Sequence, residues 1–224
     1  MRSADTTEIG KFVAHKKLRN AQKEMLIDGI NVLNEQGFLL AAAPTGIGKT
    51  AASLASTIEV ARNKSKQNQI LFLTGRQSQH KIVIETVKSI NSNLDKEISK
   101  VKVVDIIGRE SMCEDVDKMT GKCSCEEGII ETSRQSRRDD LREYILENPN
   151  HVDDIIIKSR KKKICAWATA RSAVKDCDIL VCDYNHVFVE NVRENSLSAM
   201  GIDLENTILI LSLIHISEPT RRRG

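Results

Sequence analysis

The eight residues from Ala43 to Thr50 constrain the fold of this chain more than any other segment. They read Ala-Pro-Thr-Gly-Ile-Gly-Lys-Thr, after a short apolar run at 38–42 and before a helix-compatible segment at 51–61. A strand, a glycine-containing loop and a helix in this order form a phosphate-binding loop, or P-loop. Its glycines let backbone N–H groups converge on phosphate oxygens at the positive end of the helix. The sequence therefore predicts a strand at 38–42 and a nucleoside triphosphate site.

Two residues of this loop have predicted roles in chemistry. Lys49 is expected to reach the β- and γ-phosphates, and the Thr50 hydroxyl is expected to ligate Mg²⁺. Both are therefore candidate catalytic residues as well as nucleotide contacts. The motif supplies five further candidate nucleotide contacts: Pro44, Thr45, Gly46, Ile47 and Gly48.

Composition narrows the class of protein. The formal net charge of the 224 residues is only +3, so global charge alone gives no argument for a nucleic-acid partner. No apolar run approaches the roughly 18 residues that a membrane span needs, and residues 1–10 lack the apolar core of a signal peptide. We therefore expect a cytoplasmic protein with no membrane partner. In that compartment the six cysteines favour metal, catalytic or core roles over disulfides.

Apolar runs alternate with helical patterns along much of the chain. We expect helices at 18–36 and 78–90, and strands at 69–74, 101–107, 178–183 and 207–210. Short continuous apolar strands between helices favour a parallel sheet that is covered on both faces, which is an α/β fold.

The pattern changes between Gly108 and Lys163, where strand signals vanish and charge density rises. Helices are expected at 137–147 and 152–159, separated by a break at Asn148-Pro149-Asn150. We interpret this stretch as an insertion in the α/β core. Its basic residues at 158–163 are compatible either with nucleic-acid phosphates or with a solvated helix face.

Four cysteines bracket the insertion: Cys113, Cys123, Cys125 and Cys165. Four thiolates can hold a tetrahedral Zn²⁺ or an iron–sulfur cluster, and their spacing alone does not separate either from unliganded thiols. Cys177 and Cys182, in contrast, flank or belong to an apolar strand and are predicted to be small buried residues.

Several segments together resemble the N-terminal part of XPD-type DNA helicases. The resemblance runs from about Leu18 to Ile210, and the segments that carry it are 18–22, 43–50, 73–79, 108–113, 165–171 and 177–186. It implies an incomplete RecA-like P-loop sheet with an inserted, mostly helical iron–sulfur subdomain. The implied boundaries are 1–107 and 166–210 for the RecA-like domain and 108–165 for the insertion.

The same resemblance assigns roles to residues. It implies that Arg19 and Gln22 help to recognise ATP, and that the four bracketing cysteines hold a 4Fe–4S cluster. Contacts with DNA are implied for three residues near the start of one helix: Arg76, Ser78 and Gln79. The implied activity is ATP-dependent unwinding of single-stranded or forked DNA, 5′ to 3′, in repair or genome maintenance.

The last residues are expected to lie outside this resemblance. Residues 211–221 resemble the translation of a sequencing adapter, so we expect 211–224 to be an artefactual tail. The family's Asp-Glu-Ala-His box would follow Ile210, and we expect the chain without it to be inactive. Two alternatives stay open: another P-loop enzyme with a zinc-binding insertion, and a non-catalytic nucleotide-binding protein.

Overall fold

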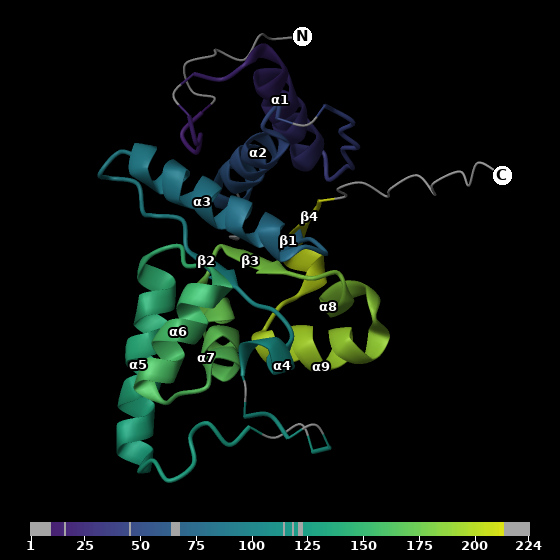
Figure 1. The fold of residues 1–224 in the computed structure, drawn as a ribbon. Helices are drawn as coiled ribbons and strands as arrows, with labels where there is room; N and C mark the ends of the chain where they lie inside the picture. Colours follow the sequence, from purple (N-terminus) through teal and green to yellow (C-terminus); the bar gives the residue numbers. More distant parts are fainter. Residues whose placement is uncertain are drawn as a thin grey trace, which may run out of the picture.

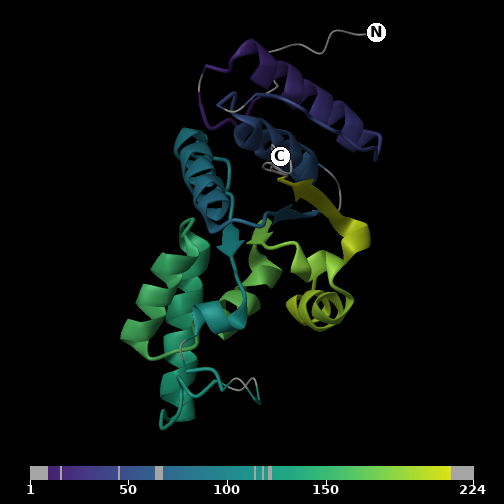
Figure 2. The same ribbon diagram turned by 45° about the vertical axis from the view of Figure 1, so that its right-hand side comes forward.

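A four-stranded parallel sheet lies between two layers of helices in the computed structural model of this chain (Figures 1 and 2). The structure describes residues 10–15, 17–44, 46–63, 68–113, 115–117, 119–120 and 123–212. The strand order is β2-β3-β1-β4, and every neighbouring pair is parallel. The strands are β1 (Gln69–Leu73), β2 (Val103–Asp105), β3 (Ile179–Cys182) and β4 (Thr207–Leu211). The α/β class predicted from the sequence is therefore confirmed.

Alternate residues of the central strands enter two separate cores. Ile70 and Phe72 of β1 belong to the core beneath α2 and α3, whereas Leu71 and Leu73 belong to the core on the opposite face. All four side chains are essentially buried. This is the behaviour of a parallel strand covered on both faces, which is why its sequence is continuously apolar.

The helices divide between the two faces of the sheet. On one side lie α2 (Lys49–Asn63) and α3 (Gln77–Asn93), with α1 (Asn20–Asn34) packed on α2. The other side carries α4 (Arg109–Met112), α5 (Glu131–Glu147), α6 (Val152–Lys162), α7 (Ala166–Ala173), α8 (Asn185–Phe188) and α9 (Glu190–Met200). Short 3₁₀ turns at Val174–Asp176 and Leu204–Asn206 precede β3 and β4. No helix among the described residues is both long and apolar enough to span a bilayer.

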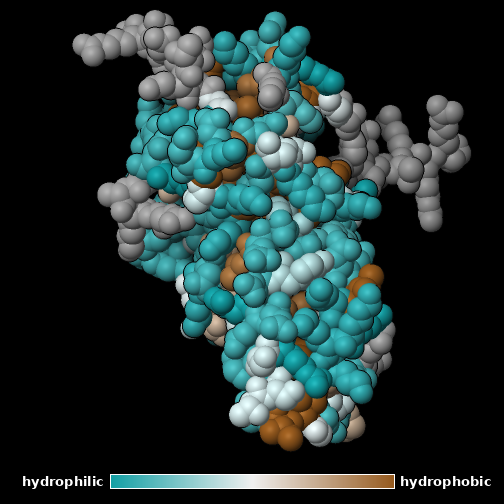
Figure 3. Space-filling model, turned by 90° about the vertical axis from the view of Figure 1, so that its left-hand side faces the viewer, coloured by the Kyte–Doolittle hydropathy of each residue, from teal (hydrophilic) through white to brown (hydrophobic). Residues whose placement is uncertain are grey.

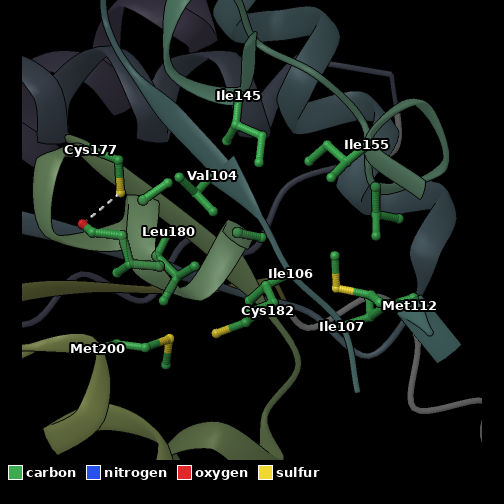
Figure 4. Close-up of a cluster of buried hydrophobic side chains, with 14 of the residues drawn as sticks. Val104, Ile106, Ile107, Met112, Ile145, Ile155, Cys177, Leu180, Cys182 and Met200 are labelled. Carbon is green, nitrogen blue, oxygen red and sulfur yellow. Dashed lines mark hydrogen bonds between the residues drawn. The ribbon is translucent and has the colours of Figure 1, made fainter. Parts of the chain in front are cut away.

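The insertion shares a core with the sheet. Ile145 of α5 and Ile155 of α6 pack in the same cluster as Val104 of β2 and Leu180 of β3 (Figure 4). The break between the two helices falls at residues 148–151, as predicted. The insertion is therefore a part of the covering layer rather than a separately packed unit.

Cys177 and Cys182 are buried, as predicted. The Cys177 thiol donates to the Val174 carbonyl oxygen at 3.2 Å, drawn as the dashed line in Figure 4. Burial raises the pKa of Cys177 to about 12 and also raises the pKa of Cys182. Both thiols therefore stay protonated near neutral pH and act as small apolar side chains.

The predicted strand at 38–42 is not formed. These residues have no strand structure, and Phe38 is fully exposed. The strand that we expected beside the P-loop would need a hydrogen-bonded neighbour, because an apolar run gains little from being extended alone. Leu209 and Leu211 of the edge strand β4 are likewise more than 40% exposed. An apolar sequence was therefore not sufficient to specify a strand here.

Element ends also differ from the prediction. β2 is limited to three residues within the predicted 101–107, and α5 begins at Glu131, six residues before the predicted start at 137. β4 includes Leu211, the first residue of the expected tail, and Ser212 N–H donates to the Leu73 carbonyl at 3.0 Å. Residues 213–224 and Thr45 lie outside the described residues.

Candidate nucleotide and metal sites

The P-loop curls through two glycines with left-handed backbone. Gly46 has φ = 81° and Gly48 has φ = 89°, a conformation that favours glycine over any residue with a Cβ atom. Lys49 is the first residue of α2, and its ammonium group turns back over the loop. It donates to the Ala43 carbonyl at 2.5 Å and to the Pro44 carbonyl at 3.1 Å. The loop, its lysine and the helix N-terminus are therefore arranged together.

Arg19 and Gln22, which are far from the loop in sequence, contact it directly. The Arg19 guanidinium donates to the Gly46 carbonyl at 2.7 Å. Gln22 is buried, and its side-chain oxygen accepts the Arg19 backbone N–H at 3.0 Å. A Cβ atom added at Gly48 would lie only 2.0 Å from the Gln22 amide nitrogen. The start of α1 is thus packed against the loop through these two side chains.

The other candidate nucleotide residues lie on or beside this cradle. Thr50 follows Lys49 in the first turn of α2 and is half-buried, and its carbonyl accepts the Ser53 hydroxyl at 3.1 Å. Pro44 is exposed and Ile47 is half-buried. The described residues of the loop are therefore exposed or half-buried rather than covered by the rest of the protein.

The three candidate DNA contacts lie where β1 gives way to α3. Arg76 and Ser78 are exposed and Gln79 is half-buried. Helix α3 begins at Gln77, so its unpaired N–H groups are close to these side chains. Tyr184, in the turn after β3, packs against Gly75, where a Cβ atom would lie 3.4 Å from the tyrosine ring. The carboxyl ends of two strands thus meet here.

The four bracketing cysteines converge on one point. Their sulfur atoms all lie within 4.8 Å of one another, and no other group of His, Cys, Asp or Glu side chains among the described residues is arranged to hold a metal ion. The Sγ atom of Cys123 is 2.8 Å from that of Cys113 and 2.6 Å from that of Cys125. Helix α4 ends at Cys113, and Cys165 caps α7 by accepting the Ala168 N–H at 3.4 Å. Two helix ends therefore fix two of the four sulfurs.

The chemistry of this donor set fits a metal centre. Burial raises the pKa of Cys113 to about 12, and burial also raises the pKa of Cys125 and of Cys165. Burial opposes ionisation of Cys123 as well, but hydrogen bonds with Cys113 and Cys125 outweigh it and lower the pKa of this thiol. Four clustered thiols lose their protons only if a cation stabilises the thiolates. A tetrahedral zinc ion with Zn–S bonds of about 2.3 Å holds sulfurs about 3.8 Å apart, and iron–sulfur clusters use the same four thiolates. Both centres therefore suit these four residues.

Glu126 links the cysteine loop to its surroundings, and sequence reasoning missed it. One of its carboxylate oxygens accepts the Cys165 backbone N–H at 3.0 Å and the Arg138 side chain at 3.0 Å, and Arg138 also pairs with the other oxygen. Burial opposes ionisation of Glu126, but these hydrogen bonds outweigh it and lower the pKa of the carboxyl. A single acidic residue beside a cysteine pair carries no sequence signal for this role.

The Trp167 ring packs against two guanidinium groups, those of Arg109 and Arg171. The guanidinium of Arg109 lies 4.9 Å from the centre of its ring system, and that of Arg171 lies 5.0 Å away. Both distances are within the range of cation–π attraction. Trp167 thus joins α4 to α7, the two helices that end or begin at cysteines of the cluster.

Two of the basic residues on α6, Lys158 and Lys162, contact side chains of α5. The Lys158 ammonium lies 4.9 Å from the centre of the Tyr144 ring, and Lys162 forms an ion pair with Asp140 at 2.6 Å. The face that carries α5 and α6 is largely hydrophilic, with small separate apolar patches (Figure 3). This surface is therefore a solvated helix face on which Lys158 and Lys162 are paired with residues of α5.

Comparisons with known proteins agree with this architecture. A family model described as DEAD_2 matches residues 50–215. The chain is 21% identical over 225 aligned positions to a probable ATP-dependent helicase of Methanocaldococcus jannaschii, covering 90% of this chain and 33% of that protein.

Solved structures give the same picture of the fold. One described as an XPD helicase has a TM-score of 0.61 and 20% identity, covering 88% of this chain and 32% of that one. Another, described as a truncated XPD, has a TM-score of 0.51 and 18% identity, covering 87% and 51%. The chain thus spans about a third of the length of the helicases that it matches.

Proposed function

Because this chain belongs to the DEAD_2 family, we propose that it is the nucleotide-binding portion of an ATP-dependent DNA helicase of the XPD type. The observation that carries the proposal is the joint presence of the Arg19–Gln22–P-loop cradle and of four converging cysteine sulfurs. Many P-loop proteins have the first feature, but the second distinguishes this chain from most of them.

In this proposal the P-loop binds ATP with Mg²⁺. Backbone N–H groups at the start of α2 receive the phosphates, Lys49 neutralises the developing charge, and Thr50 ligates the metal ion. Arg19 and Gln22 stabilise the conformation of the loop and contribute to nucleotide recognition. The contact of Arg19 with Gly46 and that of Gln22 with Gly48 support these roles.

The start of α3 is the proposed nucleic-acid contact. Arg76 and Ser78 are exposed beside the N-terminus of this helix, which suits phosphate oxygens of single-stranded or forked DNA. Gln79 lies next to them. Movement 5′ to 3′ and a role in repair or genome maintenance complete the proposal and come from the resemblance to XPD-type helicases.

The four cysteines are proposed to hold a 4Fe–4S cluster, which would supply a rigid, charged anchor for a segment with little core of its own. Glu126 and Trp167 then orient the protein around it. The proposed domain limits are 1–107 and 166–210 for the RecA-like part and 108–165 for the insertion. A zinc centre, which the same four thiolates can hold, is the alternative.

The test is ATP hydrolysis by the complete protein that contains this chain. We expect single-stranded DNA to stimulate hydrolysis, and Lys49→Ala to reduce the rate by about 100-fold or more while the fold is retained. Arg76→Ala should weaken DNA stimulation without a comparable loss of ATP binding. The 224 residues contain no Asp-Glu-Ala-His sequence, so the isolated chain should not hydrolyse ATP. DNA-independent hydrolysis by the complete protein would favour another class of P-loop ATPase.

A further inference from the structure

A single buried carboxylate, that of Asp105, contacts both helical layers. Asp105 is the last residue of β2 and has no solvent exposure. One of its oxygens lies 2.5 Å from Nδ1 of His80 on α3, and that histidine is only 2% exposed. The other oxygen accepts the backbone N–H of Val152, the first residue of α6, at 2.8 Å. The sheet, α3 and the insertion therefore meet at one side chain.

The contacts satisfy the demands of a buried acid. A carboxylate away from water is strongly unfavourable unless its oxygens are paired. The ring N–H of His80 pairs one oxygen, and the N-terminus of α6 supplies both an N–H donor and a favourable dipole to the other. Nε2 of His151 lies 3.9 Å from Asp105 and is a buried atom with no hydrogen-bond partner among the described residues. Polar groups of two helices, α3 and α6 with its N-cap His151, thus surround one carboxylate.

The contacts of Asp105 lie between the proposed DNA contacts on α3 and the helix that leads to Cys165. His80 directly follows Ser78 and Gln79, two of the proposed DNA contacts on α3. Helix α6 leads through residues 163–164 to Cys165. Asp105 therefore links the first turn of α3 to the N-terminus of α6, although the sequence separations are 25 residues from Asp105 to His80 and 47 to Val152.

We propose that Asp105 is a positioning residue that fixes the cysteine-bearing insertion relative to the start of α3. Its carboxylate acts as a shared acceptor, so that displacement of either donor weakens the hold on the other. The role of the α3 residues as DNA contacts rests on the proposed function. The coupling of α3 to α6 through Asp105 does not depend on it.

The test compares Asp105→Asn with a matched control, Asp178→Asn. Asp178 is also a nearly buried acid next to a strand, and it accepts the Lys102 backbone N–H at 2.7 Å and the Arg62 guanidinium at 3.1 Å. It lies just before β3, at the amino-terminal end of the strands, whereas Asp105 lies at the carboxyl end of the neighbouring β2. In amide hydrogen exchange, Asp105→Asn should speed exchange about tenfold or more in the first turn of α6 and in the first turns of α3. Asp178→Asn should leave both regions unchanged.

A second variant separates positioning from general loss of stability. His80→Gln should also speed exchange in α6, although no hydrogen bond or ion pair among the described residues joins His80 to that helix except through Asp105. In the Asp105→Asn background, His80→Gln should have no further effect on α6, because the shared acceptor is already lost. Unchanged α6 exchange in His80→Gln, or additive effects in the double variant, would overturn the proposal.

The same samples separate this proposal from the proposed function. Binding of a fluorescent single-stranded oligonucleotide, measured by anisotropy, reports on the DNA contacts alone. If the unmodified chain fails to bind while the exchange results are as expected, the DNA role of α3 is wrong and the positioning role of Asp105 stands. If the chain binds the oligonucleotide but the exchange coupling is absent, the positioning role of Asp105 is wrong and the DNA role of α3 stands.

Discussion

Substituting the second P-loop glycine should disturb the fold more than substituting the first. Both Gly46 and Gly48 have positive φ, so alanine is strained at either position. The surroundings differ, however. A Cβ atom at Gly46 would meet nothing within 4 Å, whereas at Gly48 it would lie 2.0 Å from the Gln22 amide nitrogen. Gly46→Ala is therefore a matched control for Gly48→Ala.

The two contributions can be estimated separately. Left-handed backbone costs an L-residue about 1–2 kcal/mol, and both variants bear this cost. In Gly48→Ala the Gln22 side chain must also move, which removes its 3.0 Å hydrogen bond from the Arg19 backbone N–H. Losing such a bond at a buried side chain costs about 1–3 kcal/mol. The expected loss of unfolding free energy is thus about 1–2 kcal/mol for Gly46→Ala and about 2–5 kcal/mol for Gly48→Ala.

The assay is urea denaturation followed by circular dichroism, with nucleotide omitted so that binding does not contribute. In thermal unfolding, each kcal/mol should lower Tm by about 2–4 °C for a domain of this size. In a Gln22→Ala background the two glycine variants should become equally destabilising, because the steric conflict is gone. Equal losses in the presence of Gln22 would refute the packing of Gln22 against Gly48.

Three further outcomes are expected. Cys165→Ser should abolish metal retention and lower stability, whereas Cys177→Ser should retain the metal; equal retention in both variants would contradict the assignment of ligands. Glu126→Gln should shorten the half-life of metal retention during chelation, because it weakens the hold on the Cys165 backbone, and an unchanged half-life would exclude this role. The hydrogen bond from His186 holds the pKa of Asp183 below its ordinary value of 3.8, so this carboxylate stabilises the fold above that pH and loses its contribution as the pH falls through the lowered pKa. Asp183→Asn should therefore be destabilising near pH 6, and in urea denaturation it should converge with the unmodified chain as the pH falls through the lowered pKa; a difference that stays constant over this range would contradict the assignment.

The sequence predicted the sheet well where burial is two-sided. The runs at 69–74 and 178–183 became β1 and β3 because both faces are covered, and covered strands are continuously apolar. The equally apolar run at 38–42 formed no strand, because apolar character specifies burial but not the partner whose backbone groups complete a strand. Short helices such as α4 escaped prediction because four residues are too few to show a helical period.

The candidate sites divide in the same way. The P-loop glycines and the four cysteines were identifiable because their chemistry dictates residue type and order. The resemblance implied only that Gln22 helps to recognise ATP, and its packing against Gly48 became evident from the structure. Glu126 and Asp105 were missed because each acts through partners distant in sequence, which no local pattern records. The tertiary contacts of single polar residues are thus the features of these sites that the sequence alone does not predict.

The central claim, that a P-loop domain carries an inserted iron–sulfur centre, is tested most directly by metal analysis of the chain purified without oxygen. Iron, acid-labile sulfide and zinc would be quantified per chain, together with the visible spectrum. The account predicts about four irons and four sulfides per chain, a brown colour, and loss of all three in Cys165→Ser. One zinc ion per chain, or no metal with an unchanged fold, would contradict it.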